Sequence, residues 1–223
     1  MLQRRTVLGA AGAGAVSSPR TEPIRTAEWQ DPARGRGIPV LVRLPRHPGP
    51  APLVLLSHGL GGSREGLAYL GRALAEAGYI AVHLQHRGSD SAVWRGQADP
   101  RMGMAAALLD PGAALARLQD IAFALDHLLA NGGGLSLDPR RIAVAGHSYG
   151  AWTASHMVGE LLPIPGLGPR LPDPRLQAAV MLSPVPPIGV SPDRAFREIV
   201  VPTLHITGTR DQGYGVADWP ART

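Results

Sequence analysis

The chain has 223 residues, 44% of them hydrophobic, with a formal net charge of +5; this suits one domain with a substantial core, and no apolar run is long enough to cross a bilayer. The absence of cysteine excludes disulfide frameworks, thiolate catalysis and cysteine-based zinc sites. Every basic residue is an arginine, and the arginines are scattered rather than gathered in one tract, which argues against nucleic-acid binding.

The first residues, MLQRRTVLGAAGAGAVSS, have the features of an export signal. An Arg-Arg pair at positions 4 and 5 precedes a short Ala- and Gly-rich stretch, and Ala-Gly-Ala at 13–15 offers the small residues of a cleavage site. We therefore expect residues 1–20 to be a twin-arginine-type signal, cleaved near Ala15, and the protein to be periplasmic or extracellular. The alternative is a disordered N-terminus with a chance Arg-Arg pair on a cytoplasmic protein.

Apolar runs then alternate with helical patterns. Residues 26–31 and 38–45 are predicted strands joined by a basic turn. Mainly apolar runs without polar alternation predict buried strands of a parallel sheet, at 52–58, 79–86, 141–146, 178–183 and 203–208. Helices are predicted at 67–74, 115–129 and 153–162. This alternation is typical of an α/β fold with a mostly parallel sheet flanked by helices.

Residues 89–112 interrupt this alternation with an irregular segment. Inserts of this kind often form a cap or lid over a site, and they are about as often merely structural excursions. Both interpretations stay open for this segment.

The pattern G-x-S-x-G occurs at Gly146-His147-Ser148-Tyr149-Gly150, between an apolar strand and a predicted helix. In this context the backbone must turn sharply and leave the serine hydroxyl projecting, while the two glycines let strand and helix approach. The pattern therefore predicts that Ser148 is a nucleophile; the alternative is an ordinary turn of small residues.

A serine nucleophile needs two hydrogen-bond donors for the oxygen of the tetrahedral intermediate. The backbone N–H of Tyr149, at the start of the helix, is one candidate. The second is expected from the Gly-rich loop SHGLGGS at 57–63, where we assign the backbone N–H of Leu60. His58 in this loop is predicted to be structural, bonding to backbone near the strand end.

The same loop could instead cradle a dinucleotide phosphate. The pattern G-x-G-x-x-G would start at Gly59, but it requires glycine where the chain has Arg64. No carboxylate suited to a ribose follows the next strand before Asp90. A nucleotide site is therefore not expected.

The acid of a catalytic triad should follow a later strand, and Asp211 comes just after the strand that ends at Gly208. Its carboxylate could orient a histidine ring and stabilise the imidazolium. The alternative is a loop aspartate that caps a turn. Ser183, after the preceding strand, is followed by no carboxylate, which favours Asp211.

With these motifs the chain resembles the α/β-hydrolases, and within that fold the predicted dienelactone hydrolases and the platelet-activating-factor acetylhydrolase-like serine esterases. The resemblance rests on SHGLGGS, HRGSD, DIAFALDHL, DPRRIAVAGHSYG and ITGTRD. It implies hydrolysis of a carboxylic ester or lactone, a class that includes lipid esters, through a serine acyl-enzyme without a cofactor. The residues it carries over are Ser148, Asp211, Leu60 and Tyr149.

The resemblance also implies the chain order serine, acid, histidine, yet all eight histidines precede Asp211. His86, at a strand end, is the least unfavourable substitute. A metal is not expected, because His83 and His86 lie three apart on a strand and point to opposite faces. We expect residues 21–223 to be an α/β-hydrolase domain that lacks its last strand and helix. Two functions stay open: a serine ester hydrolase, and an impaired fragment or non-catalytic scaffold.

Overall fold

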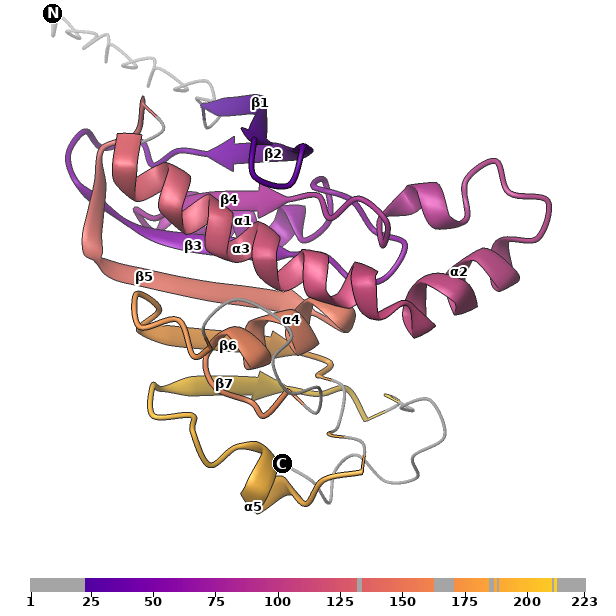
Figure 1. Cartoon of the computed structure of the whole chain (residues 1–223). Helices are drawn as coiled ribbons and strands as arrows, with labels where there is room; N and C mark the ends of the chain where they lie inside the picture. The colour runs from indigo at the N-terminus through magenta and orange to yellow at the C-terminus, as the bar shows by residue number, and fades with distance from the viewer. Residues whose placement is uncertain are drawn as a thin grey trace, which may run out of the picture.

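The computed structural model describes residues 23–131, 134–162, 171–184, 187, 189–209 and 211. The predicted export signal, residues 1–20, lies outside the described residues. The described residues form a seven-stranded sheet in the order β1-β2-β4-β3-β5-β6-β7 (Figure 1). Its strands are β1 (Ile24–Asp31), β2 (Arg36–Arg43), β3 (Ala51–Ser57), β4 (Ile80–Leu84), β5 (Leu137–His147), β6 (Ala178–Leu182) and β7 (Thr203–Ile206).

The five strands from β4 to β7 run parallel, as their unbroken apolar runs predict, and β3 and β4 are almost wholly buried. The first two strands form an antiparallel hairpin, and β2 also pairs antiparallel with β4. The sheet is therefore mostly parallel, with two antiparallel strands at one edge. At the other edge β7 leaves the side chains of Leu204 and Ile206 about half exposed.

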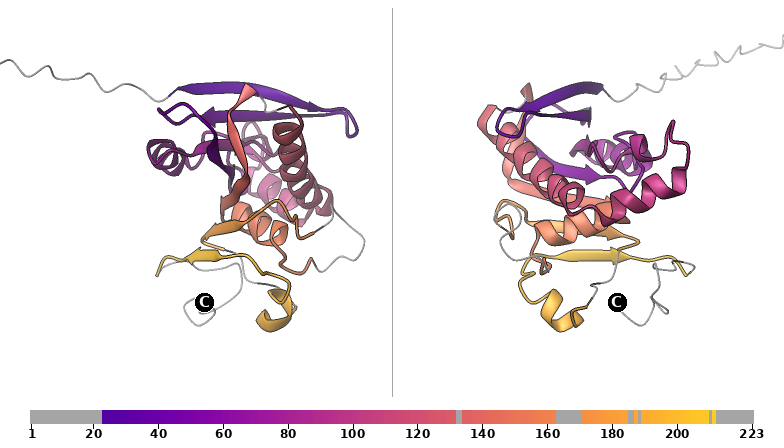
Figure 2. Two further views of the ribbon diagram at one scale, coloured as in Figure 1. Left: turned by 90° about the vertical axis from the view of Figure 1, so that its left-hand side faces the viewer. Right: turned by 45° about the vertical axis from the view of Figure 1, so that its right-hand side comes forward.

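Helices cover both faces of the sheet. Helix α1 (Ala68–Glu76) packs on one face, where its leucines meet a small cluster of β3 and β4 side chains. Helices α3 (Pro111–Asn131) and α4 (Tyr149–Met157) lie side by side on the opposite face and form the larger core (Figure 2). No helix among the described residues is long and apolar enough to span a membrane.

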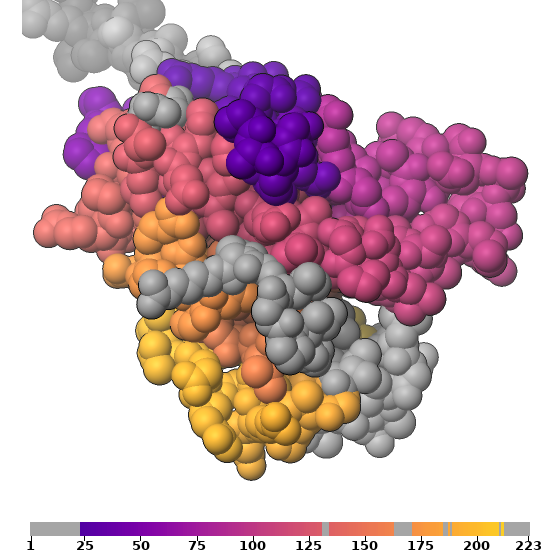
Figure 3. Space-filling model, viewed as in Figure 1, coloured from indigo at the N-terminus to yellow at the C-terminus, as the bar shows by residue number. Residues whose placement is uncertain are grey.

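The segment predicted to be irregular contains a short 3-10 turn (Ser91–Val93) and the helix α2 (Pro100–Leu109). The helix begins there because the Asp99 carboxylate accepts hydrogen bonds from the N–H groups of Arg101 and Met102, and proline occupies the first helical position. The segment stands out from the body (Figure 3), on the side toward which the arrows of the parallel strands point in Figure 1. It is therefore placed as a cap above the carboxyl edge of the sheet.

Helix α4 differs from its predicted span of 153–162. It begins four residues earlier, directly after Ser148, and ends at Met157. The chain turns at Gly159, whose φ is +120°, and a methyl group there would lie 2.6 Å from the Glu198 carbonyl oxygen. A short helix, α5 (Pro192–Ala195), in the link between β6 and β7 was not predicted.

Candidate active site

Ser148 occupies a strained turn between β5 and α4. Its φ is 53° and its ψ is −117°, a combination that is costly for a residue other than glycine. A methyl group on Gly146 would lie 2.0 Å from the Gly150 carbonyl oxygen, and one on Gly150 would lie 1.9 Å from that of Ser57. Both positions therefore require glycine, which is the strand–turn–helix geometry typical of a nucleophile elbow.

The loop after β3 lies in direct contact with this turn. A methyl group on Gly59 would come within 3.5 Å of Ser148 Cβ and 3.3 Å of the His147 carbonyl oxygen. Leu60 follows in this loop, and Tyr149 is the first residue of α4, where a helical N–H lacks an intrahelical partner. In the described part of the chain neither N–H donates to a carbonyl of another loop or turn, so both are available to an oxyanion.

His58 is fixed beneath this loop through both ring nitrogens. Its Nδ1–H donates to the Gly59 carbonyl oxygen at 2.6 Å, and its Nε2 accepts the backbone N–H of His86 at 3.0 Å. Burial, together with the charge of Arg117, lowers the pKa of His58 well below its usual value. His58 therefore has the structural role that its place in the sequence predicts.

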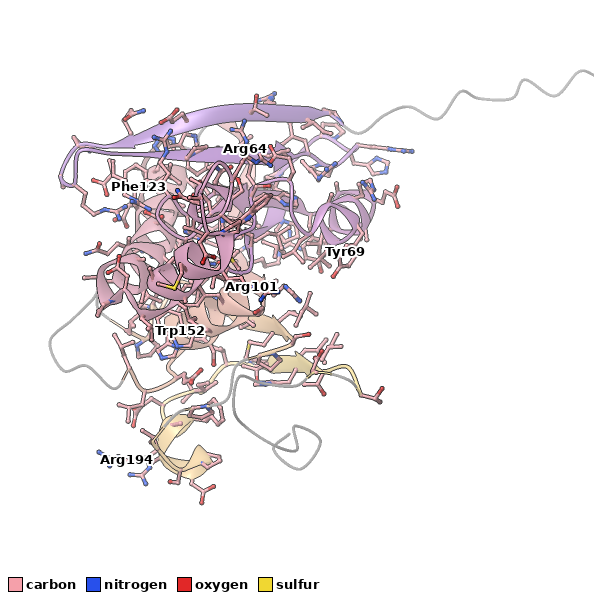
Figure 4. The ribbon with its side chains drawn as sticks, turned by 90° about the vertical axis from the view of Figure 1, so that its right-hand side faces the viewer. Arg64, Tyr69, Arg101, Phe123, Trp152 and Arg194 are labelled. Atoms are coloured by element: carbon pink, nitrogen blue, oxygen red, sulfur yellow. The ribbon has the colours of Figure 1, made fainter. Side chains whose placement is uncertain are left out.

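A cavity of about 670 Å³ opens beside Ser148, at the carboxyl edge of the sheet. This volume suits a small-molecule substrate. Its wall is largely apolar and includes Leu60 and Leu67, the α2 residues Met104 and Leu108, and Trp152 of α4. Figure 4 views this side of the molecule, where Trp152 appears between Arg101 of the cap and Arg194 of α5. The cap thus forms part of the wall of the cavity that contains the serine.

A buried titratable pair lies farther along the same cavity wall. His156 Nδ1 donates to the Trp152 carbonyl oxygen at 2.9 Å and lies 3.6 Å from Glu160 Oε2. Burial lowers the pKa of His156 to about 4, so its ring is neutral at pH 7. Burial raises the pKa of Glu160 to about 7, so its carboxyl changes charge near neutral pH.

Asp211 follows β7 at the same edge of the sheet. Its carboxylate accepts the Gly208 N–H at 2.8 Å. Hydrogen bonds from Gly208 and Ser183, and the nearby charge of His147, hold the pKa of Asp211 below its usual value. The group is therefore ionised at neutral pH, as a triad acid must be, and its bond to Gly208 also matches the turn-capping alternative.

His86 lies behind the nucleophile turn and is fully buried. Its Nδ1–H donates to Asp120 at 3.0 Å and its Nε2 accepts the Ser57 hydroxyl at 3.0 Å. Burial and the charge of Arg117 lower the pKa of His86 to about 4. The Asp120 carboxylate therefore orients the His86 ring, a partner that the sequence did not reveal. The other ring nitrogen is hydrogen-bonded to Ser57 and not to Ser148. Among the described residues no hydrogen bond joins a histidine to Ser148.

Arg117 on α3 is the functional candidate that the sequence reasoning missed. It is fully buried and hydrogen-bonds to both the loop after β3 and helix α4. A signal existed, because Arg117 stands one helical turn from both Ala113 and Ile121, in the middle of an apolar stripe. Among the described residues no cluster of three or more metal-ligating side chains could hold a metal ion.

A family model described as the alpha/beta hydrolase family matches residues 53–222. This range contains the elbow, the Gly-rich loop, the cap and Asp211. The chain belongs to the alpha/beta hydrolase family. The resemblance that the motifs indicated is confirmed at the level of the family, and so is the fold class. No curated protein sequence matches this hydrolase.

Solved structures share the fold of this hydrolase at low sequence identity. A ferulic acid esterase from Streptomyces cinnamoneus is 23% identical with a TM-score of 0.55, over 88% of this chain and 76% of that one. A cold-adapted esterase from an Arctic intertidal metagenomic library is 17% identical with a TM-score of 0.57, over 89% and 77%. A dienelactone hydrolase from Anabaena variabilis is 20% identical with a TM-score of 0.54, over 82% and 74%.

Proposed function

We propose that this hydrolase cleaves carboxylic esters or lactones through a serine acyl-enzyme. The observation that carries the proposal is the position of Ser148, on a strained turn that borders a largely apolar cavity. The proposed oxyanion donors are the backbone N–H groups of Leu60, which follows the Gly59 that contacts the turn, and of Tyr149, the first residue of α4. A nucleotide site has no comparable support among the described residues.

In the proposed reaction the Ser148 oxygen attacks the substrate carbonyl carbon, and the hydroxyl proton passes to a general base. The negative charge on the carbonyl oxygen is stabilised by the N–H groups of Leu60 and Tyr149. The carbon–oxygen bond to the alcohol breaks, and the alcohol leaves with a proton. Water then attacks the acyl-enzyme, which releases the carboxylic acid and restores Ser148. In this proposal Asp211 is the carboxylate that would orient an imidazole base; among the described residues its hydrogen bonds are to Gly208 and Ser183.

The cavity supports a small-molecule ester with an apolar acyl or alcohol group. Leu60, Leu67, Met104 and Leu108 provide apolar contacts beside Ser148, and Trp152 adds an aromatic face. The ferulic acid esterase, the cold-adapted esterase and the dienelactone hydrolase have names that agree with an ester or lactone substrate. A lipid ester is one member of this class.

A second candidate is a catalytically impaired or non-catalytic hydrolase scaffold. One observation favours it: no histidine among the described residues hydrogen-bonds to Ser148. Without one triad member, an elbow and oxyanion hole still give about 10³–10⁴-fold acceleration over water. The esterase and the impaired scaffold are therefore both expected to hydrolyse esters, and they differ in the expected rate.

Rates of hydrolysis of p-nitrophenyl acetate and p-nitrophenyl butyrate test both candidate functions. Wild type, Ser148→Ala and Ser136→Ala are compared, the last as a control serine at the opposite end of the sheet, where the Ser136 carbonyl oxygen accepts the Ala51 N–H. Ester hydrolysis by wild type and Ser136→Ala that disappears in Ser148→Ala supports the esterase. A weak rate that depends on Ser148 supports the impaired scaffold, and a rate unaffected by Ser148→Ala contradicts both.

A further inference from the structure

Arg117, on α3, is a buried arginine whose donors are all directed at polar groups near the candidate active site. Its guanidinium is fully buried, and a buried charge is costly unless it is hydrogen-bonded and paired. It nevertheless lies outside the wall of the cavity that contains Ser148. Arg117 therefore does not contact a substrate in that cavity, and it can act on the site only through the residues to which it is hydrogen-bonded.

One branch of the guanidinium holds the loop that carries Leu60. Nη2 donates to Ser57 Oγ at 3.0 Å and to the carbonyl oxygen of His58. These two residues end β3 and lead directly into the loop. Leu60 follows His58 by only two residues, so these hydrogen bonds from Arg117 restrain the position of the Leu60 N–H.

A second branch holds the start of helix α4. Nε donates to Thr153 Oγ1 at 2.9 Å, and the Thr153 hydroxyl donates in turn to the carbonyl oxygen of Tyr149 at 2.9 Å. The guanidinium carbon also lies 4.6 Å from the centre of the Tyr149 ring, within reach of a cation–π interaction. The first turn of α4, which supplies the other donor, is thus tied to the same side chain.

The third branch reaches the Leu60 loop from its far side. Nη1 donates to Ser89 Oγ at 2.8 Å, and the Ser89 carbonyl oxygen accepts the N–H of Gly61 at 2.9 Å. The loop is therefore held before and after Leu60 by groups that converge on one guanidinium.

We propose that Arg117 is a positioning residue that fixes the separation of the two oxyanion donors, the N–H groups of Leu60 and Tyr149. This inference rests on the proposed function. Only arginine suits the place, because a planar fork can donate to three segments at once, whereas a lysine ammonium offers a single compact centre. Donors aimed beforehand at the developing charge stabilise the transition state without reorganisation.

The groups behind Arg117 keep Ser57 in the required orientation. The Ser57 hydroxyl donates to His86 Nε2, which leaves the Ser57 oxygen to accept from Arg117. His86 in turn donates to Asp120, and Arg36 Nε donates to the same carboxylate at 2.9 Å. The Asp120 carboxylate can only accept, so His86 Nδ1 carries the ring proton and His86 Nε2 accepts from Ser57, which determines the direction of these hydrogen bonds.

The test measures binding of a transition-state analogue and of a ground-state analogue to the same variants. A phenyl boronic acid forms a tetrahedral adduct with the serine and needs the oxyanion donors, whereas the matching phenyl carboxamide does not form one. Arg117→Lys and Arg117→Ala are compared with wild type and with Arg175→Ala, which removes ion pairs to Asp173 and Asp126 away from the site. Circular dichroism and urea unfolding establish which variants are folded.

We expect Arg117→Lys to weaken boronic acid binding by about tenfold or more, since loss of one oxyanion donor costs about 10²–10³-fold in turnover. Carboxamide binding should change less than about twofold, and Arg175→Ala should change neither. Guanidinium at millimolar concentration should partly restore boronic acid binding to Arg117→Ala but not to wild type. Equal weakening of both ligands, or unchanged boronic acid binding in a folded Arg117 variant, would overturn the inference.

Thr153→Val tests the positioning role of Arg117 if neither Arg117 variant folds. It removes the hydroxyl that links Arg117 to Tyr149 with little change in volume, and we expect the same selective loss, smaller in size. Unchanged binding of both ligands by folded Thr153→Val then refutes the inference. Failure of wild type to bind the boronic acid through Ser148 would instead refute the proposed function.

Discussion

His86 accepts a hydrogen bond from the Ser57 hydroxyl, with 3.0 Å between His86 Nε2 and Ser57 Oγ. The distance places His86 within a buried network that ends at Asp120. The His86 ring therefore stabilises the end of β3, and it is not available as a general base for Ser148. This relationship gives the first prediction.

His86→Ala should lower the free energy of unfolding by about 1–3 kcal/mol, because it leaves Ser57 and Asp120 with unmet hydrogen bonds in a buried place. The measurement is urea unfolding, with His205→Ala on the edge strand β7 as the control and a much smaller loss expected there. A His86→Ala protein as stable as wild type that has lost all Ser148 reactivity would make His86 the base.

Gly150→Ala should destabilise the elbow. The added methyl would lie 1.9 Å from the Ser57 carbonyl oxygen, so strand and helix must separate, at a cost of about 1–3 kcal/mol or more. Gly112→Ala at the start of α3 is the control, because its methyl would meet only the flexible end of Asp110. Thermal unfolding compares the two variants. Equal melting temperatures would contradict the close packing of the elbow.

Buried histidines should make the fold sensitive to acid, and one of them is His58, whose pKa burial lowers well below its usual value. Burial lowers the pKa of His83, His86 and His156 to about 4, below the value of about 6.5 for an exposed histidine. Between these values the unfolded chain binds protons that the folded chain does not. The free energy of unfolding should therefore fall as pH drops from about 6.5 to 4, by about 1–3 kcal/mol for each histidine.

Glu160 opposes this trend, which supplies the matched control. Burial raises its pKa to about 7, so its contribution to stability is lost as pH rises from about 4.5 to 7. Glu160→Gln removes that contribution and should show a steeper loss toward acid than wild type. Urea unfolding between about pH 7.5 and 4.5 checks both proteins. If the free energy of unfolding depended on pH in the same way in both proteins, the raised pKa of Glu160 would be contradicted. If that of wild type did not change with pH, the lowered pKa values of the histidines would be contradicted.

The sequence predicted most of the fold, because each of its signals was local. Every strand of the sheet was located from the sequence, all but the mostly polar first one by an apolar run, and the glycines around Ser148 predicted the turn that the structure shows. The Gly-rich loop was expected beside the serine, and Gly59 does contact it. These features depend on residues close together in the chain.

The features that the sequence missed depend on distant residues. Arg117 bonds to groups 28, 36, 59 and 60 positions away, and His86 finds Asp120 34 positions away. A helical pattern reports which side of α3 is apolar, but it does not report which polar groups meet a charge placed on that side. The early end of α4 was missed for a similar reason, because the turn at Gly159 packs against Glu198 from another segment.

Export is a separate prediction that rests on the sequence alone. We propose that residues 1–20 direct twin-arginine export with cleavage near Ala15. Lysine at positions 4 and 5 should leave the protein in the cytoplasm, as followed by cell fractionation and N-terminal sequencing. Unchanged export of that variant would reject the twin-arginine route, and a wholly cytoplasmic wild type would reject the signal.

The most direct test of the central claim is the site of labelling by a fluorophosphonate. The probe phosphonylates a serine that is both activated and served by an oxyanion hole. We expect one adduct on the folded protein, located at Ser148 by mass spectrometry and lost in Ser148→Ala. An adduct that maps to Ser57 or Ser183, or that survives Ser148→Ala, would contradict it.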